Sequence, residues 1–311
     1  MSNMNKTLTL LCGLSLWCVT TQVLVSCEKP IFEEEPKETT ENKSKNGKEN
    51  VILRVTEFRQ IPFDDLSASA PSFTRSLTDL ASYCSRLNFV IYKDGKKIDS
   101  KSQMKDDNGF GEITFSLQPD TYKLLVLAHS SVGGTPSLTD PEKIQFTNAI
   151  GFSDTFSYYG NLEVTTDQNH HDIILTRNVS CVRFIVKDDF PSDVKYMRFN
   201  YTGGSGVLNA VTGFGGNVNS QQEKSVDISK FSTPITFNLY TFLQEEEAFL
   251  QLTVSALKAD KSTVVMKRVF EKIPMKHRMV TEYSGCFFDS DHTFGLLADT
   301  DWGDPYYKEE Y

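Results

Sequence analysis

The sequence predicts an all-β protein built from two tandem antiparallel β-sandwiches. Short runs of β-branched and aromatic residues recur after residue 50 at spacings of roughly 8–15 residues, the pattern of sandwich strands. The chain holds 22 Phe and 12 Tyr, residue types that fit pleated, half-buried surfaces. No amphipathic helical pattern of about 12 residues stands out after residue 50.

The N-terminus has the features of a lipoprotein signal peptide over residues 1–26. Residues 1–6 hold one cation, and the run Leu8–Val25 is apolar with only small or weakly polar interruptions. Leu24, Val25 and Ser26 then precede Cys27 in the order that lipoprotein signal peptidase recognises. We therefore predict cleavage before Cys27, which leaves a cysteine carrying diacylglycerol and palmitoyl lipid as the new N-terminus. The alternative is an uncleaved anchor helix with an incidental cysteine.

The predicted lipid sets the expected location. Each buried methylene contributes about 0.8 kcal/mol, so two or more acyl chains hold a protein to a bilayer almost permanently. We expect a Gram-negative outer-membrane protein. The acidic run Glu33-Glu34-Glu35 resembles the signal by which members of the Bacteroidetes export lipoproteins to the outer face of that membrane, and it predicts surface exposure. The alternative interpretation of this run is a solvated linker.

Residues 27–50 are predicted to be a flexible acidic tether. The segment is charged, contains proline and is nearly free of aromatic residues, so it cannot bury enough apolar surface to offset the entropy of ordering. A tether of this length spans roughly 25 Å on average. The 311-residue chain has a formal net charge of −9 with scattered Lys and Arg, which excludes nucleic acid from the expected partners.

Residues 51–177 are predicted to form the N-terminal sandwich. Residues 78–84 are expected to form one short helix, after a loop over 60–75. Asp94-Gly95 marks the tight turn of a hairpin. The expected strands run over 51–58, 86–92, 96–100, 111–117, 122–129, 152–159, 162–164 and 172–177, with a long polar excursion over 130–150.

Residues 178–290 are predicted to form the C-terminal sandwich, with the boundary between residues 177 and 179 and a tail over 291–311. A glycine-rich stretch over 203–216 interrupts this half. The expected strands run over 179–186, 196–201, 235–242, 249–257, 264–273 and 281–288.

Three cysteines remain in the predicted mature chain besides Cys27. Cys84, Cys181 and Cys286 are widely spaced, and no metal-binding spacing appears. Cys181 lies in an apolar strand and is predicted to be a buried, inert thiol. The sequence leaves open one disulfide among the three.

No catalytic constellation is present in the sequence. We predict no enzyme activity, no metal site and no cofactor besides the lipid on Cys27. Gly203–Gly206 lacks the Lys-Ser/Thr of a phosphate loop and fits a hairpin loop. His170 and His171 are adjacent, so on a strand they point to opposite faces, and they suit a solvated loop better than a metal. The tail segment Asp299–Asp304 alternates carboxylates, but its glycine comes one position too early for a calcium loop.

Aromatic side chains are the candidates for sugar binding. Tyr158, Tyr159 and Trp302 have rings that would stack on a sugar if they were exposed. The alternative is that they belong to the core, as most aromatic residues of sandwiches do.

Several short motifs follow one another in a distinctive order. After the lipoprotein cysteine come Leu87–Ile98, Leu117–Leu124, Tyr158–Gly160, Ile174–Val179, Asn209–Gly213, Ile273–Pro274 and Thr281–Tyr283. Together they resemble the FimB/Mfa-type fimbrillin-associated anchor lipoproteins of Bacteroidales, which belong to type V fimbriae. The resemblance spans residues 50–290.

The resemblance implies two transthyretin-like β-sandwiches and a role in surface fimbriae. In that family the anchor subunit holds the shaft to the outer membrane, so fimbrial shaft subunits are the implied partners. Stalk subunits of this system are trimmed at an arginine near the first strand, which opens a groove for another subunit's strand. Arg54 and Arg59 lie in the corresponding region. Because an anchor must keep its lipidated N-terminus, we expect Arg54 to be an uncut strand residue.

The sequence thus favours a structural protein, an outer-membrane fimbrial anchor. Its expected docking surfaces are edge strands with unpaired backbone N–H and C=O groups. The alternative is an adhesin or a glycan-binding accessory or tip lipoprotein on the same fold, with host or dietary glycans as ligands. A glycosidase would need paired carboxylates in a cleft, and the sequence points to none.

Overall fold

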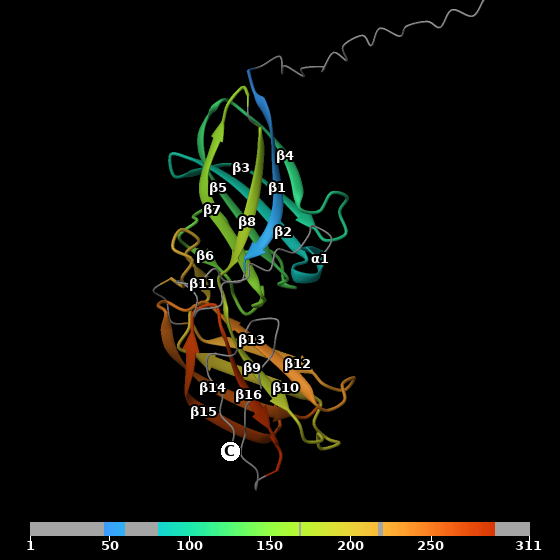
Figure 1. The fold of residues 1–311 in the computed structure, drawn as a ribbon. Helices are drawn as coiled ribbons and strands as arrows, with labels where there is room; N and C mark the ends of the chain where they lie inside the picture. The colour runs from blue at the N-terminus through green and yellow to red at the C-terminus, as the bar shows by residue number, and fades with distance from the viewer. Residues whose placement is uncertain (1–46, 60–79, 168, 217–219, 290–311) are drawn as a thin grey trace, which may run out of the picture. The chain divides into compact units, whose positions relative to one another are not determined.

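A computed structural model describes residues 47–59, 80–167, 169–216 and 220–289, all of which belong to one compact unit (Figure 1). The predicted all-β class is confirmed. Among the described residues the one α-helix is the four-residue α1 (Leu80–Tyr83), inside the range expected for a helix. Within the same ranges, no helix has the length and apolar character needed to cross a bilayer.

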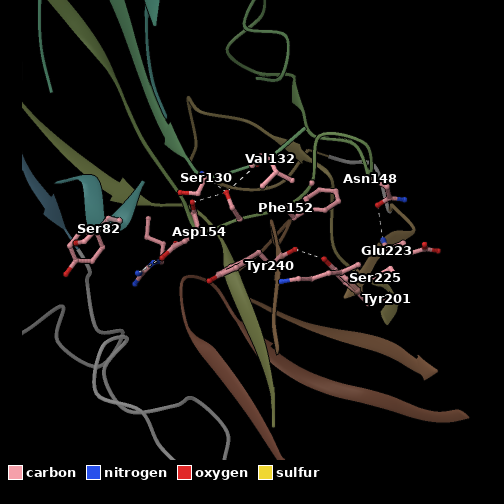
Figure 2. A pocket seen from close by; sticks show the side chains of 16 residues that line it. Ser82, Ser130, Val132, Asn148, Phe152, Asp154, Tyr201, Glu223, Ser225 and Tyr240 are labelled. Atoms are coloured by element: carbon pink, nitrogen blue, oxygen red, sulfur yellow. Dashed lines mark hydrogen bonds and ion pairs between the residues drawn. The ribbon is translucent and has the colours of Figure 1, made fainter. Parts of the chain in front are cut away.

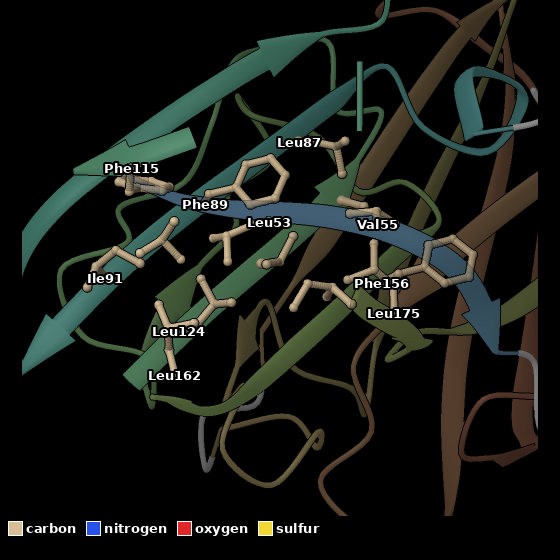
Figure 3. Packing of buried hydrophobic residues seen from close by; sticks show 14 of the residues in the cluster. Leu53, Val55, Leu87, Phe89, Ile91, Phe115, Leu124, Phe156, Leu162 and Leu175 are labelled. Atoms are coloured by element: carbon tan, nitrogen blue, oxygen red, sulfur yellow. The ribbon is translucent and has the colours of Figure 1, made fainter. Parts of the chain in front are cut away.

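The first half of the described chain forms one seven-stranded sheet that bends into two layers. In spatial order its strands are β3 (Lys96–Met104), β2 (Arg86–Lys93), β5 (Asp120–His129), β7 (Thr155–Val164), β8 (His170–Arg177), β1 (Glu49–Arg59) and β4 (Glu112–Leu117). β7 and β8 pair at just two positions, so the sheet turns a corner there. The strands β8, β1 and β4 therefore form the second layer of a sandwich (Figure 3).

The core of this sandwich lies between β1 and the strands opposite it. Figure 3 shows Leu53 and Val55 of β1 pointing toward Leu87, Phe89 and Leu124 across the core. All of these side chains are almost fully buried. Alternation of buried residues along β1 follows from the two-residue period of a strand.

The predicted hairpin of β2 and β3 is confirmed. Asp94 and Gly95 adopt positive φ values of 50° and 72°. This backbone fits the right-handed twist of the flanking strands, and Asp-Gly tolerates it well. The register from Arg86–Met104 to Lys93–Lys96 carries one irregularity, beside Tyr92.

The second half contains two facing sheets. One holds β12 (Gln222–Asp227), β10 (Tyr196–Thr202), β14 (Glu247–Leu257) and β15 (Val264–Lys276). The other holds β13 (Ile235–Thr241), β9 (Ser180–Val186) and β16 (Val280–Gly285). Their inner faces share a core rich in phenylalanine, in which the Phe199 ring contacts both Phe184 and Phe237.

Two segments predicted as loops carry a short ladder. β6 (Ile144–Gln145), in the excursion over 130–150, pairs with β11 (Val207–Leu208) in the glycine-rich stretch. Ile144 and Leu208 are buried there in a third apolar cluster, together with Val90, Leu125 and Phe242. Residues from both halves of the chain thus share one cluster.

Several details differ from the sequence expectations. Two strand pairs are parallel, β1 with β8 and β9 with β16, because the long chain between the partners permits a crossover. The two strands expected over 152–159 and 162–164 are one strand, β7, which begins at Thr155. β1 begins at Glu49, inside the range expected for the tether. The predicted domain boundary at residues 177–179 stays a prediction.

Candidate functional site

The predicted lipid site lies outside the described residues. This holds for Leu24, Val25, Ser26 and Cys27, and also for Trp302 and the acidic segment 299–304. The structural evidence on function therefore comes from the folded residues that follow the predicted tether.

Arg54 lies in the middle of β1, with a strand on each side. Its backbone is in register with Glu112 of β4 and Asp172 of β8. The side chain is half exposed, and its Nε donates a hydrogen bond to the Glu112 carboxylate at 2.7 Å. An exposed pair of this kind contributes little to stability. Arg54 is a strand residue, as expected, and its resistance to cutting stays a prediction.

β1 is held by pairing on both edges as well as by its buried face. It runs antiparallel to β4 over Glu49–Arg54 and parallel to β8 over Ile52–Arg59. Val51, Leu53 and Val55 are at most 1% exposed. The strand that continues from the predicted tether is therefore an internal part of the first sandwich.

The edge strands β3 and β4 are joined by side chains. Lys101 Nζ of β3 donates a hydrogen bond to the Thr114 backbone oxygen of β4 at 2.6 Å. The Gln103 amide donates to the Glu112 oxygen at 2.8 Å and accepts from the Gly111 N–H at 3.0 Å. Edge carbonyls that were expected to be unpaired thus have partners. We call this junction the β3/β4 seam.

The same arrangement recurs between β12 and β13. Lys224 Nζ donates to the Asn238 backbone oxygen at 2.8 Å, and the Gln222 amide donates to the Tyr240 oxygen at 3.3 Å. The Tyr201 hydroxyl also donates to the Tyr240 oxygen, at 3.0 Å.

Carbonyls of the outer strand β15 also accept hydrogen bonds from side chains. Its Lys276 oxygen accepts from the Ser180 hydroxyl at 2.9 Å, and its Pro274 oxygen accepts from the Thr281 hydroxyl. At these positions the expectation of unpaired edge carbonyls is wrong. The physical reason is that free edge carbonyls template unwanted strand pairing, which side-chain donors suppress.

A cleft of about 630 Å³ combines charged, hydroxyl and aromatic side chains (Figure 2). Ser130, Ser131 and Val132, just after β5, and Gly151–Asp154, just before β7, form one wall. The other wall comes from Tyr201 of β10, Tyr240 of β13 and residues 223–225 of β12. Segments far apart in the sequence therefore meet at this cleft.

Arg177 and Asp154 form a nearly buried ion pair in the cleft. Arg177 donates two parallel hydrogen bonds to the Asp154 carboxylate, at 2.8 and 2.7 Å, and packs over the Phe156 ring. The two side chains are 4% and 18% exposed. Bidentate geometry makes this pair strong and satisfies both charges.

Lys224 places a half-buried positive charge at the same cleft. Burial lowers the pKa of its ammonium from the usual value. One of its three N–H donors is used by the Asn238 oxygen. Among the described residues, no carboxylate forms an ion pair with Lys224.

The remaining candidates from the sequence lie apart from this cleft. Tyr158 and Tyr159 of β7 are half-buried and pack against the apolar clusters, so the core interpretation of these two is confirmed. His170 and His171 begin β8, and the described residues include no group of three or more side chains suited to a metal. Gly203–Gly206 connects β10 to β11.

The three cysteines that follow Cys27 are free thiols. Cys181 is fully buried, as predicted, and burial raises its pKa to about 12. Cys84 is also buried, with a pKa of about 12 for the same reason. Cys286 is half-buried. The disulfide that the sequence left open is not formed.

Sequence reasoning missed the cleft residues. Lys224 lies on β12, whose inward positions Gln222 and Lys224 are polar, so no apolar alternation marked the strand. The serines lie in the excursion over 130–150, where nothing in the spacing links them to β12. A weak signal was available in the two adjacent serines, Ser130 and Ser131, directly after a buried strand.

Comparison with known proteins gives one family match and several structural likenesses. The model of the fimbrillin-A associated anchor proteins Mfa1 and Mfa2 matches residues 76–266. No curated protein matches the chain.

Three solved structures are similar to this chain in fold. A candidate adhesin from Bacteroides ovatus is 14% identical, with 80% of this chain and 88% of that chain covered and a TM-score of 0.45. A fimbrial assembly protein from Parabacteroides distasonis is 12% identical, with 83% and 97% covered and a TM-score of 0.38. The fimbrial anchor protein Mfa2 from Porphyromonas gingivalis is 13% identical, with 71% and 82% covered and a TM-score of 0.37.

Proposed function

Because the chain belongs to the family of fimbrillin-A associated anchor proteins, we propose that it is a surface-exposed lipoprotein that anchors a fimbrial shaft to the outer membrane. The family is a fimbrial one and not an enzyme family, so the role is fimbria-associated. The proposed protein sits at the outer membrane, holds the shaft there and catalyses no reaction.

The membrane end of the proposed link is Cys27. Leu24, Val25 and Ser26 precede it in the order of a lipoprotein cleavage site, and an apolar run lies before them. Acyl chains on Cys27 would hold the protein at the bilayer. The charged residues 28–48 then connect the lipid to β1.

The observation that carries the proposal is the position of β1. A pull on the tether acts along β1, and the hydrogen bonds to β4 and β8 lie across that direction. Several bonds therefore carry the load at once. The burial of Val51, Leu53 and Val55 adds resistance to extraction. A strand held in this way suits a protein that joins a polymer to a membrane.

Retention of an intact β1 is part of the proposal. A protease needs its substrate backbone in extended, accessible form, whereas Arg54 is paired on both sides. Cutting there requires local unfolding of the first sandwich. It would also separate the lipid from the body of the protein.

The test is release of the protein and of its fimbriae by Cys27→Ala. We expect the variant to leave the membrane fraction and fimbriae to be shed into the medium. The matched control is Cys286→Ala, which removes a half-buried free thiol and leaves the lipid in place. Fimbriae that stay cell-bound in Cys27→Ala cells contradict the anchor role. A mature N-terminus at Val55 without an acyl group, found by mass spectrometry, contradicts it as well.

A second candidate function is glycan binding by an accessory or tip subunit. The observation that favours it is the cleft, which combines serine hydroxyls with the aromatic side chains of Phe152 and Tyr240. The discriminating measurement is co-purification. An anchor brings down shaft subunits, whereas an adhesin of the second kind binds a host or dietary glycan without them.

A further inference from the structure

The cleft has the size and lining of a carbohydrate site. A volume of about 630 Å³ falls within the range of small-molecule pockets. Ser130, Ser131 and Ser153 place hydroxyls on one wall, and Ser225 does so on the other. The Ser130 hydroxyl accepts a hydrogen bond from the Ser85 N–H at 3.0 Å, and the hydroxyls of Ser131 and Ser153 lie 3.3 Å apart, so the protein itself holds these polar groups in place at the cleft.

Apolar surface is present at the same cleft. Val132 is 95% exposed, and the half-buried ring of Phe152 also lines the cleft (Figure 2). Sugar rings have one face of C–H groups and a rim of hydroxyls. A cleft with an aromatic ring and several hydroxyl donors complements both parts.

The charges of the lining favour an acidic ligand. Asp154 is neutralised by Arg177 through two hydrogen bonds. Glu223 is exposed, and its carboxylate lies 3.8 Å from the Arg198 guanidinium. The Lys224 ammonium has no carboxylate partner among the described residues, because its described hydrogen bond goes to the neutral Asn238 backbone oxygen. It keeps N–H donors that a ligand can use. A half-buried cation without a counter-charge is partly desolvated, and a ligand carboxylate would supply the missing charge.

We propose that this cleft binds a carboxylate-bearing sugar, with Lys224 Nζ donating to the sugar carboxylate. The serine hydroxyls and the Asn148 amide bind ring hydroxyls, and Phe152 packs against the C–H face. The shared chemistry is that of uronic and sialic acids. The inference rests on no part of the anchoring role, and it names the ligand class for the glycan binding given above as the second candidate function.

The test uses the full mature protein extracted in detergent and titrated with paired ligands. Trigalacturonic acid is compared with its methyl ester, and sialyllactose with lactose. The first pair differs only in the charge of the carboxylates, and the second differs by the presence of the sialic acid. Comparing the two pairs shows whether the ligand is a uronic or a sialic acid. A short peptide with a free C-terminal carboxylate and its amidated form make a third pair.

Variants assign the carboxylate contact. Lys224→Met is expected to weaken binding of the acidic sugar about tenfold or more, since a charged hydrogen bond is lost. Lys224→Arg should retain much of the affinity. Lys267→Met is the matched control, because Lys267 is an exposed lysine of the same sheet and does not line the cleft. Phe152→Ala gives a second loss that leaves the β12/β13 contact of Lys224 unchanged.

The outcomes separate cleanly. The proposal is supported if the protein binds an acidic sugar but not the neutral member of the pair, and if Lys224→Met abolishes that binding. The thermal unfolding midpoint of Lys224→Met must match that of the control. Equal binding of both members of each pair overturns the carboxylate contact. Binding of the peptide alone, or of no ligand, overturns the sugar assignment. Fimbrial retention should be unchanged in Lys224→Met cells, so failure here is distinguishable from failure of the anchor role.

Discussion

Lys101 of β3 donates a hydrogen bond across the first sandwich to the Thr114 backbone oxygen of β4, at 2.6 Å. The two strands are the ends of one seven-stranded sheet. Lys101 also lies over the Phe115 ring, 5.2 Å from its centroid. This long side chain thus occupies a carbonyl that an incoming strand would need, so the β3/β4 seam is a poor site for strand addition.

Opening this seam should promote self-association. Lys101→Met keeps the length of the side chain but removes its donor, so the Thr114 oxygen becomes available to another chain. We expect a loss of about 0.5–1.5 kcal/mol in unfolding free energy and association that rises with protein concentration. Sedimentation velocity measures the association. Lys97→Met, an exposed position of the same strand, is the control, and equal behaviour of the two variants would contradict the role of the seam.

The ion pair of Arg177 and Asp154 should contribute far more to stability than that of Arg54 and Glu112. Asp154→Asn leaves a guanidinium that is 4% exposed without its carboxylate, and we expect a loss of about 3 kcal/mol or more. Glu112→Gln acts on a pair that is 46% and 44% exposed, where a loss below about 1 kcal/mol is expected. Urea denaturation of both variants makes the comparison. Similar losses in the two variants would show that burial does not increase the contribution of the Arg177–Asp154 pair to stability.

Two buried histidines predict a loss of stability in acid. Burial, aided by nearby Arg86, lowers the pKa of His129 to about 4, and burial with Arg278 lowers that of His277 to about 3. In the unfolded chain both imidazoles take up a proton below their usual pKa of about 6.5. The unfolded state therefore binds more protons between about pH 4 and 6.5, and stability falls as pH falls, by up to about 1.4 kcal/mol per pH unit for each histidine.

His277→Phe tests this dependence. The imidazole makes no described hydrogen bond and stacks on Phe214 at 4.2 Å, so a phenyl ring fits its surroundings. Urea unfolding from pH 4.5 to 7.5 should show a shallower slope in this variant. An unchanged slope in His277→Phe would count against a neutral buried imidazole.

Thiol reactivity should follow burial. Burial raises the pKa of Cys84 and Cys181 to about 12, so their thiolate forms are scarce at neutral pH. Cys286 is half-buried and should react first with a thiol reagent under native conditions. Mass spectrometry after brief labelling assigns the site. Labelling of Cys181 at the rate of Cys286 would indicate an opening of the second sandwich.

The sequence by itself determined the all-β class, most strands and the tight turn at Asp94-Gly95, because these depend on local alternation and local backbone preference. It also supplied the predicted lipid site at Cys27. It missed β12, because Gln222 and Lys224 face inward where apolar residues were expected.

Only the tertiary structure decided the seams and the cleft. Lys101 meets Thr114, and Lys224 meets Asn238, through contacts between a side chain and a distant backbone carbonyl. Such a contact leaves no periodic trace, because any lysine on an exposed strand looks the same in the sequence. The parallel pairing of β1 with β8 is likewise invisible, since it depends on which strands the folded sheet brings together.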